Sequence, residues 1–243
     1  MNKSIKLLLL CTLSFFSLNL VATILNAFFQ IRKAKMLYPN NFTISLSSKG
    51  IIVNNTLFGL FEGDYFLIIT VVVSIAVLSS FLWFTNKVYG NSYPLALRKP
   101  KKTKVVILLI IGSLVIFTLI EKIIVNYLQG NYFDTNAIIT SAKYIPLLIA
   151  QVIILSPLIE EIFFRGILYN YLTEKYNVAL SIFATSFLFT VLHSQYGKIE
   201  LMILFCSALV SGYLRHISNS LYPPIAFHTL NNIVPFLFFL FKK

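Results

Sequence analysis

A series of long apolar runs, separated by short polar segments, constrains this chain more than any other feature. A helix that crosses a bilayer needs about 20 mostly apolar residues, because its backbone must satisfy its own hydrogen bonds in lipid. The sequence therefore predicts an all-α fold, a polytopic transmembrane helix bundle of about seven or eight spans. The candidate spans cover about residues 6–29, 63–85, 105–127, 144–171, 177–193, 199–216 and 222–241.

The composition also indicates that the chain is surrounded by lipid rather than by water. Of the 243 residues, 58% are hydrophobic and only 12% are charged, whereas a soluble domain has about 25% charged residues. The net charge of +12 could indicate nucleic-acid binding, but the lysines and arginines cluster between the apolar runs, as membrane topology requires. We therefore expect the lipid bilayer as a partner and no nucleic acid.

The polar segments predict an orientation in the membrane. Residues 86–104 hold six basic residues and no acidic ones, and such loops mark the cytoplasmic side. The first apolar run lacks a clear cleavage site, so an uncleaved helix with a cytoplasmic N-terminus is expected. The segment 30–62 then lies outside, and its four basic residues count against this assignment. The richness in Lys, Asn, Ile and Phe indicates an AT-rich genome, which favours a bacterial cell membrane.

Several ionisable or strongly polar side chains fall inside the C-terminal apolar runs. An ionised group inside a bilayer costs a few kcal/mol or more, so such residues persist where they face a polar cavity and find partners. They are therefore candidates for a functional site. The residues are Glu160, Glu161, Arg165, His193, His228 and Asn232.

Helical spacing assigns different surroundings to the two adjacent glutamates. Glu161 and Arg165 are four residues apart, so they share a helix face and can form an ion pair. Glu160 is rotated by about 100° from Glu161, so the two cannot have the same role. His228 and Asn232 are also four residues apart and present an imidazole and an amide side by side.

The depths of these residues in the bilayer agree only in part. If the chain turns near Asn177, Glu160 and His193 each lie about 16 residues from the turn, at a common depth of about 24 Å. His228 lies early in its run, some 15 Å from the level of Glu160 by the same count. A hairpin that projects beyond the bilayer, a strong tilt or an irregular segment at 194–199 would remove this difference, and the sequence leaves the choice open.

Three motifs follow one another on successive apolar runs. They are Glu-Glu-x-x-x-Arg at 160–165, Phe-x-x-x-His at 189–193 and His-x-x-x-Asn at 228–232. In this order, with a glycine after the arginine, they resemble the CPBP family, which includes type II CaaX prenyl endopeptidases and bacteriocin-processing or immunity proteins. The resemblance covers about residues 144–241, which implies a catalytic transmembrane core there. Residues 1–143 carry no recognisable motif and form a separate N-terminal group of helices.

The resemblance implies roles for the polar residues. Glu160 resembles the base that activates the attacking water, and His193 resembles the residue that positions it. His228 and Asn232 resemble the donors that stabilise the oxyanion, while Glu161 and Arg165 resemble a supporting ion pair. The chemistry is consistent, because peptide hydrolysis needs a base near a water and donors aimed at the developing negative charge.

The cofactor is open at the level of sequence. One glutamate and two histidines, here Glu160, His193 and His228, match a catalytic zinc ligand set. The adjacent glutamates and the His/Asn pair equally suit a metal-free glutamate mechanism. We favour the metal-free mechanism and keep a divalent metal, with zinc first, as the alternative.

Three classes of function are compatible with these observations. The first is an intramembrane endopeptidase that hydrolyses a membrane-associated peptide or protein. The second is a non-catalytic membrane scaffold, such as an immunity or regulatory protein on the same fold. The third is a transporter, which predicts inverted repeats, but the N-terminal half has no counterpart of the glutamate pair. Every expected catalytic position is occupied, which favours the enzyme.

Overall fold

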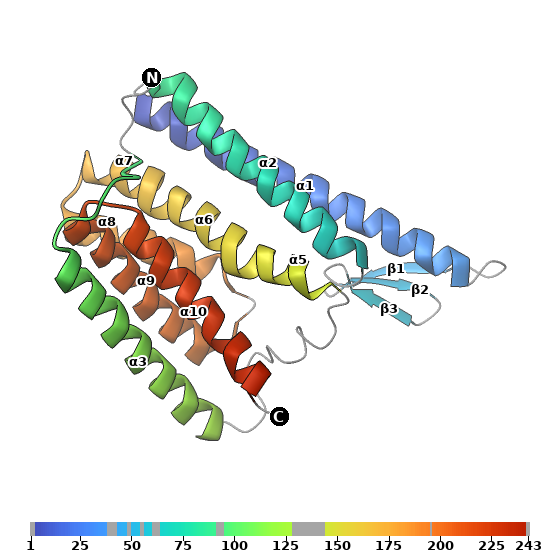
Figure 1. Ribbon diagram of the computed structural model, residues 1–243. Helices are drawn as coiled ribbons and strands as arrows, with labels where there is room; N and C mark the ends of the chain where they lie inside the picture. Colours follow the sequence, from blue (N-terminus) through green and yellow to red (C-terminus); the bar gives the residue numbers. More distant parts are fainter. Residues whose placement is uncertain are drawn as a thin grey trace.

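The computed structural model describes residues 3–37, 43–47, 50–53, 56–59, 64–90, 95–127, 144–194 and 196–241. The chain forms a helix bundle (Figure 1), and its helical segments occupy all seven predicted ranges. The segments are α1 (Lys3–Leu37), α2 (Asp64–Tyr89), α3 (Thr103–Tyr127), a composite helix (Ile145–Thr173), α8 (Val178–Val191), α9 (Lys198–Ser218) and α10 (Tyr222–Phe241).

The lengths and composition of these helices fit a membrane. Among the described residues, five helices are long and apolar enough to cross it, and Val178–Val191 is a shorter apolar helix. Large apolar side chains face outward along α1 and α3, where a soluble protein would carry polar groups. The prediction of a helical membrane bundle is confirmed, and the chain is an integral membrane protein.

Helices α1 and α2 form an antiparallel hairpin on one side of the composite helix (Figure 1). Small and apolar residues, such as Cys11 of α1 and Val77 of α2, are buried between them. At the end near the N-terminus, the Ser4 hydroxyl lies 2.7 Å from the Tyr89 hydroxyl and donates to the carboxylate of Glu174 at 2.6 and 2.8 Å. These bonds tie the hairpin to the segment that follows the composite helix.

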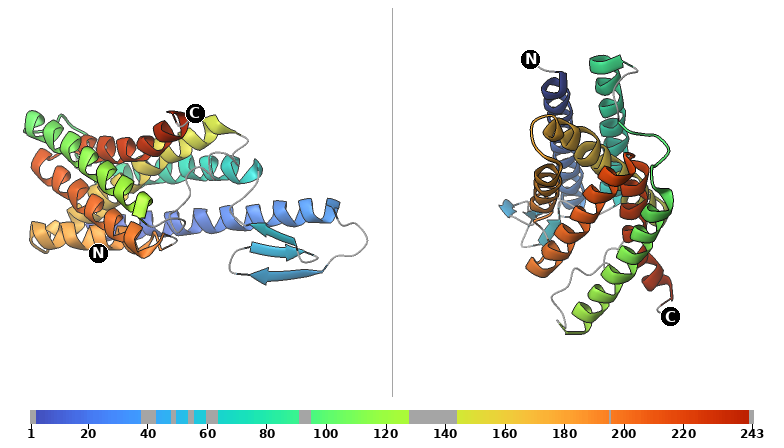
Figure 2. Two further views of the ribbon diagram at one scale, coloured as in Figure 1. Left: turned by 90° about the horizontal axis from the view of Figure 1, so that it is seen from below. Right: turned by 90° about the vertical axis from the view of Figure 1, so that its left-hand side faces the viewer.

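A small sheet lies at the opposite end of the hairpin, beside the far half of α1 (Figure 2). Its strands, β1 (Ile44–Ser47), β2 (Gly50–Val53) and β3 (Thr56–Gly59), pair antiparallel in the order β1-β2-β3. The sequence analysis did not anticipate this addition to the helical bundle. Strands of four residues are too short to give more than a weak periodic signal.

The composite helix lies between the α1–α2 hairpin and the group formed by α3, α8, α9 and α10 (Figure 1). Two stretches of π-helix interrupt its α-helical geometry. Such bulges occur often at functional sites, because they offset the backbone hydrogen bonds by one residue. The sequence of elements is α5 (Ile145–Ile149), η2 (Ala150–Leu155), α6 (Ser156–Glu161), η3 (Ile162–Leu168) and α7 (Tyr169–Thr173).

Helix α8 is short and packs closely on α9. Its N-cap is Asn177, whose side-chain oxygen accepts the Leu180 N–H at 2.8 Å, so the chain turns where the sequence predicted. The helix has 14 residues, about 21 Å, which is less than the hydrocarbon thickness of a bilayer. A Cβ placed on Gly212 would lie only 2.8 Å from Cγ2 of Ile182, so glycine allows the two helices to approach.

The start of α10 explains the depth of His228. Leu221, just before α10, packs against Gly166 of the composite helix, and its N–H donates to Ala96 O at 2.9 Å. Helix α10 therefore begins level with Gly166, while α7 and the turn at Asn177 extend further. This offset brings His228 to the level of Glu160, and its Nε2 lies 3.7 Å from Oε2 of that glutamate.

The predicted division of the chain near residue 143 lies outside the described residues and stays a prediction. The basic segment at 95–104 is placed by the structure at the same end as the start of α1, because Lys101 N–H donates to Ser218 O at 2.8 Å and Ser4 lies beside Tyr89. The last turn of α10 lies at the opposite end (Figure 1).

Candidate active site

Glu160 and Glu161 end the α-helical turn between the two π-helical stretches, and their exposure differs sharply. The Glu161 side chain is 1% exposed, whereas that of Glu160 is 23% exposed. The rotation of about 100° between adjacent helical residues points one carboxylate into the bundle and leaves the other accessible. The predicted difference in their surroundings is therefore observed.

The buried carboxylate of Glu161 has three partners from three helices. Its Oε2 lies 3.4 Å from Nε of Arg165 and accepts the Ser211 hydroxyl at 2.9 Å. Its Oε1 lies 3.0 Å from Nδ1 of His228. The predicted ion pair with Arg165 is present, but Glu161 also holds a histidine that the sequence assigned to another group.

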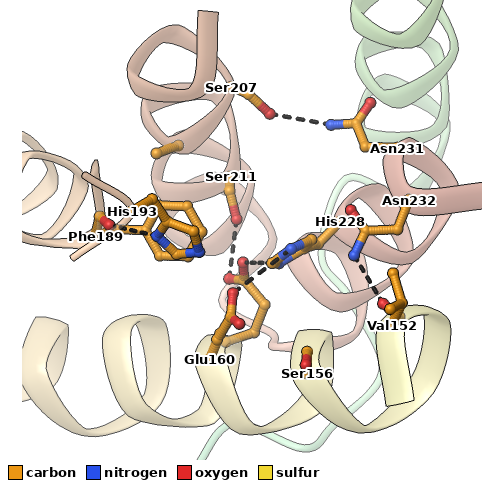
Figure 3. Close-up of polar contacts among 12 residues, drawn as sticks. Val152, Ser156, Glu160, Phe189, His193, Ser207, Ser211, His228, Asn231 and Asn232 are labelled. Carbon is orange, nitrogen blue, oxygen red and sulfur yellow. Dashed lines mark hydrogen bonds and ion pairs between the residues drawn. The ribbon is translucent and has the colours of Figure 1, made fainter. Parts of the chain in front are cut away.

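His228 contacts both carboxylates, and Figure 3 shows its imidazole beside Glu160. Its Nδ1 contacts Glu161, and its Nε2 is 3.7 Å from Oε2 of Glu160. The Phe189 ring meets the imidazole edge-on, with the ring centroids 5.8 Å apart. These contacts leave the imidazole little rotational freedom.

Arg165 is completely buried and is held by more than its ion pair. Its Nη2 donates to Ala208 O of α9 at 3.0 Å, and its guanidinium lies 5.0 Å from the centre of the Phe189 ring. A cation over an aromatic face is stabilised by the negative charge of that face. Phe189 thus connects the first and second motifs through packing.

His193 follows the end of α8 and lies on the α8 side of the glutamate pair, whereas His228 lies on the α10 side (Figure 3). Its Nδ1 is 2.7 Å from Phe189 O. A carbonyl oxygen only accepts hydrogen bonds, so Nδ1 carries the hydrogen and Nε2 is an acceptor in the neutral ring. Within the described part of the chain, His193 makes no direct bond to Glu160.

Asn232 lies one turn after His228 on α10, and its amide Nδ2 donates to Val152 O of η2 at 2.8 Å (Figure 3). The neighbouring Asn231 is directed to α9, where its Nδ2 donates to the Ser207 hydroxyl at 3.0 Å. The two adjacent asparagines thus bind different elements. Of the pair, Asn232 is the one held against the composite helix.

Sequence reasoning missed three residues near the site. Ser211 binds Glu161, and Arg215, one turn later on α9, donates to Arg165 O at 3.1 Å. Their spacing of four places them on one face of α9, which was a usable signal. Tyr196 stacks on His193 with the ring centroids 6.0 Å apart.

The surroundings of Tyr196 place it close to the accessible carboxylate. Burial raises the pKa of the Tyr196 phenol, and the carboxylates of Glu160 and Glu200 raise it further. A tyrosine in the turn after α8 gives no sequence signal for this position, because only the turn brings its ring beside His193.

The metal ligand set that the sequence left open is not preassembled. In the ranges that the structure describes, no group of three His, Cys, Asp or Glu side chains is arranged to hold a metal ion. Glu160, His193 and His228 therefore do not form a ligand set in this geometry.

Comparison with known proteins identifies the segment that holds the site. Residues 142–234 match the family model described as Type II CAAX prenyl endopeptidase Rce1-like. This segment resembles that family. The match includes all three motifs and agrees with the CPBP resemblance of the sequence. No curated protein and no solved structure matched the chain.

The Rce1-like match bears on the general class of function. The family is one of proteases, and the chain has the apolar helices of a membrane protein. The match extends from the start of the composite helix into α10, so the elements it covers are those that carry the polar residues. Helices α1 to α3 lie outside it.

Proposed function

We propose that the chain is an intramembrane endopeptidase that hydrolyses a peptide bond in a membrane-associated peptide or protein. The observation that carries the proposal is the contrast between Glu160, accessible beside Nε2 of His228, and Glu161, buried beside Nδ1 of the same imidazole. A structural carboxylate pair would need no accessible member. The Rce1-like match supports the same class of reaction.

In the proposed reaction, the Glu160 carboxylate takes a proton from a water molecule as the water oxygen attacks the scissile carbonyl carbon. His193 accepts the other water hydrogen at Nε2 and so orients the water. The carbonyl π bond opens to an oxyanion, which receives hydrogen bonds from Nε2–H of His228 and the amide of Asn232. Donors of this kind are worth about 3–4 kcal/mol each in a preorganised site.

The tetrahedral intermediate then collapses. The C–N bond breaks, the oxyanion becomes a carboxyl group, and Glu160 returns its proton to the leaving amine. With a hydrogen on each ring nitrogen, His228 and Arg165 balance the two glutamates, so the cluster is neutral overall. Neutrality favours such a cluster inside a membrane, where net charge is costly.

The same proposal assigns the chain a place in the cell. We propose that it lies in a bacterial cell membrane with its N-terminus in the cytoplasm. The basic residues 98–104, which lie at the end of the bundle that also holds the start of α1, support this orientation. Membrane-embedded helices around the site favour substrates that reach it along the bilayer.

Glu160→Gln tests the proposed function, because it keeps the size of the side chain and removes the base. Turnover should fall by about 10²–10⁴, while folded abundance stays unchanged. Quantitative comparison of protein termini in membranes with wild type and variant identifies the substrates. Glu121→Gln, on α3 and remote from the site, is the matched control. A Glu160→Gln protein with full biological function would support the non-catalytic scaffold instead.

A further inference from the structure

Pro157 changes the backbone hydrogen bonding of the π-helical stretch that precedes it. In a π-helix each carbonyl accepts the N–H five residues later, and Ser156 N–H donates to Gln151 O in this register. The next bond of the register would join Val152 O to residue 157. Because that residue is proline, it has no N–H to donate. Val152 O therefore lacks its π-helical partner.

The Asn232 amide donates to this carbonyl at 2.8 Å (Figure 3). Pro157 is buried and lies in the segment against which α10 packs, so the interaction is part of the helix interface. Since a carbonyl oxygen can only accept, it determines which end of the amide faces η2. One hydrogen of Nδ2 is used in this bond, and the second is left for another acceptor.

We propose that Pro157 is a positioning residue, which keeps Val152 O open so that this carbonyl holds the Asn232 amide with its second N–H directed to the substrate. The proposal rests on the proposed function, in which Asn232 donates to the oxyanion. Pro157 itself touches neither the water nor the substrate carbonyl. It acts through the orientation of one side chain.

The physical reason is preorganisation. An oxyanion donor is effective because it is already oriented before the charge develops. An alanine at position 157 supplies a backbone N–H that competes with Asn232 for Val152 O. The amide then rotates away from the carbonyl in part of the population, and the second N–H loses its direction.

Pro157→Ala should lower kcat by roughly 10-fold, less than the 10²–10³ that follows loss of a whole oxyanion donor. KM should not change, because the oxyanion exists only in the transition state. The measurement is turnover in detergent of a substrate identified by the comparison of termini. Pro146→Ala is the matched control, because Pro146 lies in the first turn of α5, where the N–H has no helical acceptor.

A second substitution separates the missing N–H from the proline ring. Replacing Pro157 by lactic acid through an ester bond removes the ring but supplies no N–H, so kcat should return to the wild-type value. If the ester variant is as slow as Pro157→Ala, the ring matters and the proposal is wrong. Normal abundance and thermal unfolding of each variant serve as the folding check.

A double-mutant cycle with Asn232→Ala gives the decisive comparison. If Pro157 acts through Asn232, Pro157→Ala has no further effect on kcat in the Asn232→Ala background. Losses that multiply, or a wild-type kcat for Pro157→Ala, overturn the positioning role. Failure of the proposed function is distinguishable, because it would show as full turnover of Glu160→Gln.

Discussion

The Nδ1 of His228 lies 3.0 Å from Oε1 of Glu161, although the two residues are 67 positions apart in the chain. This bond joins the first motif to the third. Glu161 therefore pairs with Arg165, and it also orients the imidazole that lies beside Glu160. A carboxylate that orients a catalytic histidine is a recurrent arrangement in hydrolases.

Glu161→Gln should destabilise the protein as well as inactivate it. The amide leaves the buried guanidinium of Arg165 without a counter-charge, which costs about 3–5 kcal/mol when one member of a buried pair is removed. We expect low folded abundance and an earlier thermal unfolding transition in detergent. Ser211→Ala is the control, since it removes one hydrogen bond to Glu161 and should cost only about 1 kcal/mol. Equal stability of Glu161→Gln and wild type would contradict this role.

Removal of metal ions should not affect turnover. The prediction follows from the proposed mechanism, in which Glu160, His193, His228 and Asn232 act directly on water and substrate. Exhaustive chelation followed by activity measurement and elemental analysis provides the check. A stoichiometric zinc ion, whose removal abolishes turnover and whose return restores it, would show that the metal alternative is correct.

Gly212→Ala should separate α9 from α8. The added Cβ would lie 2.8 Å from Cγ2 of Ile182, well inside van der Waals contact, so the helices must shift. Overpacking of this kind costs about 1–3 kcal/mol, measurable as a loss of thermal stability. Ile182→Ala in the same chain should restore much of it by making room.

Gly112→Ala is the matched glycine control, because a Cβ there meets no atom within 4 Å. Alanine is favoured over glycine in a helix by about 0.5–1 kcal/mol, so this variant should be at least as stable as wild type. If both substitutions had the same effect, close packing at Gly212 would not be the cause.

The orientation in the membrane can be tested with single cysteines. In a chain without Cys11 and Cys206, a cysteine at Lys101 should react with an impermeant maleimide only after the cytoplasmic side is opened. A cysteine at Ser45, exposed on β1 at the other end of the molecule, should react in intact cells. The reverse pattern would mean that the N-terminus lies outside.

Local sequence determined the helices and one ion pair. The lengths of the apolar runs predicted all seven helical segments, because a backbone in lipid must bond to itself along the chain. The spacing of four between Glu161 and Arg165 placed them on one face for the same local reason. The helical rotation of about 100° per residue also predicted different surroundings for Glu160 and its buried neighbour Glu161.

Only the tertiary structure decided which helices supply the partners of these residues. The contacts of Glu161 with Ser211 and His228, and of Asn232 with Val152, depend on how deep α9 and α10 lie against the composite helix. For α10, the packing of Leu221 on Gly166 accompanies that depth, which the number of residues in a turn does not predict. Helical periodicity is a property of neighbours in the chain, whereas relative depth is a property of surfaces that meet after folding.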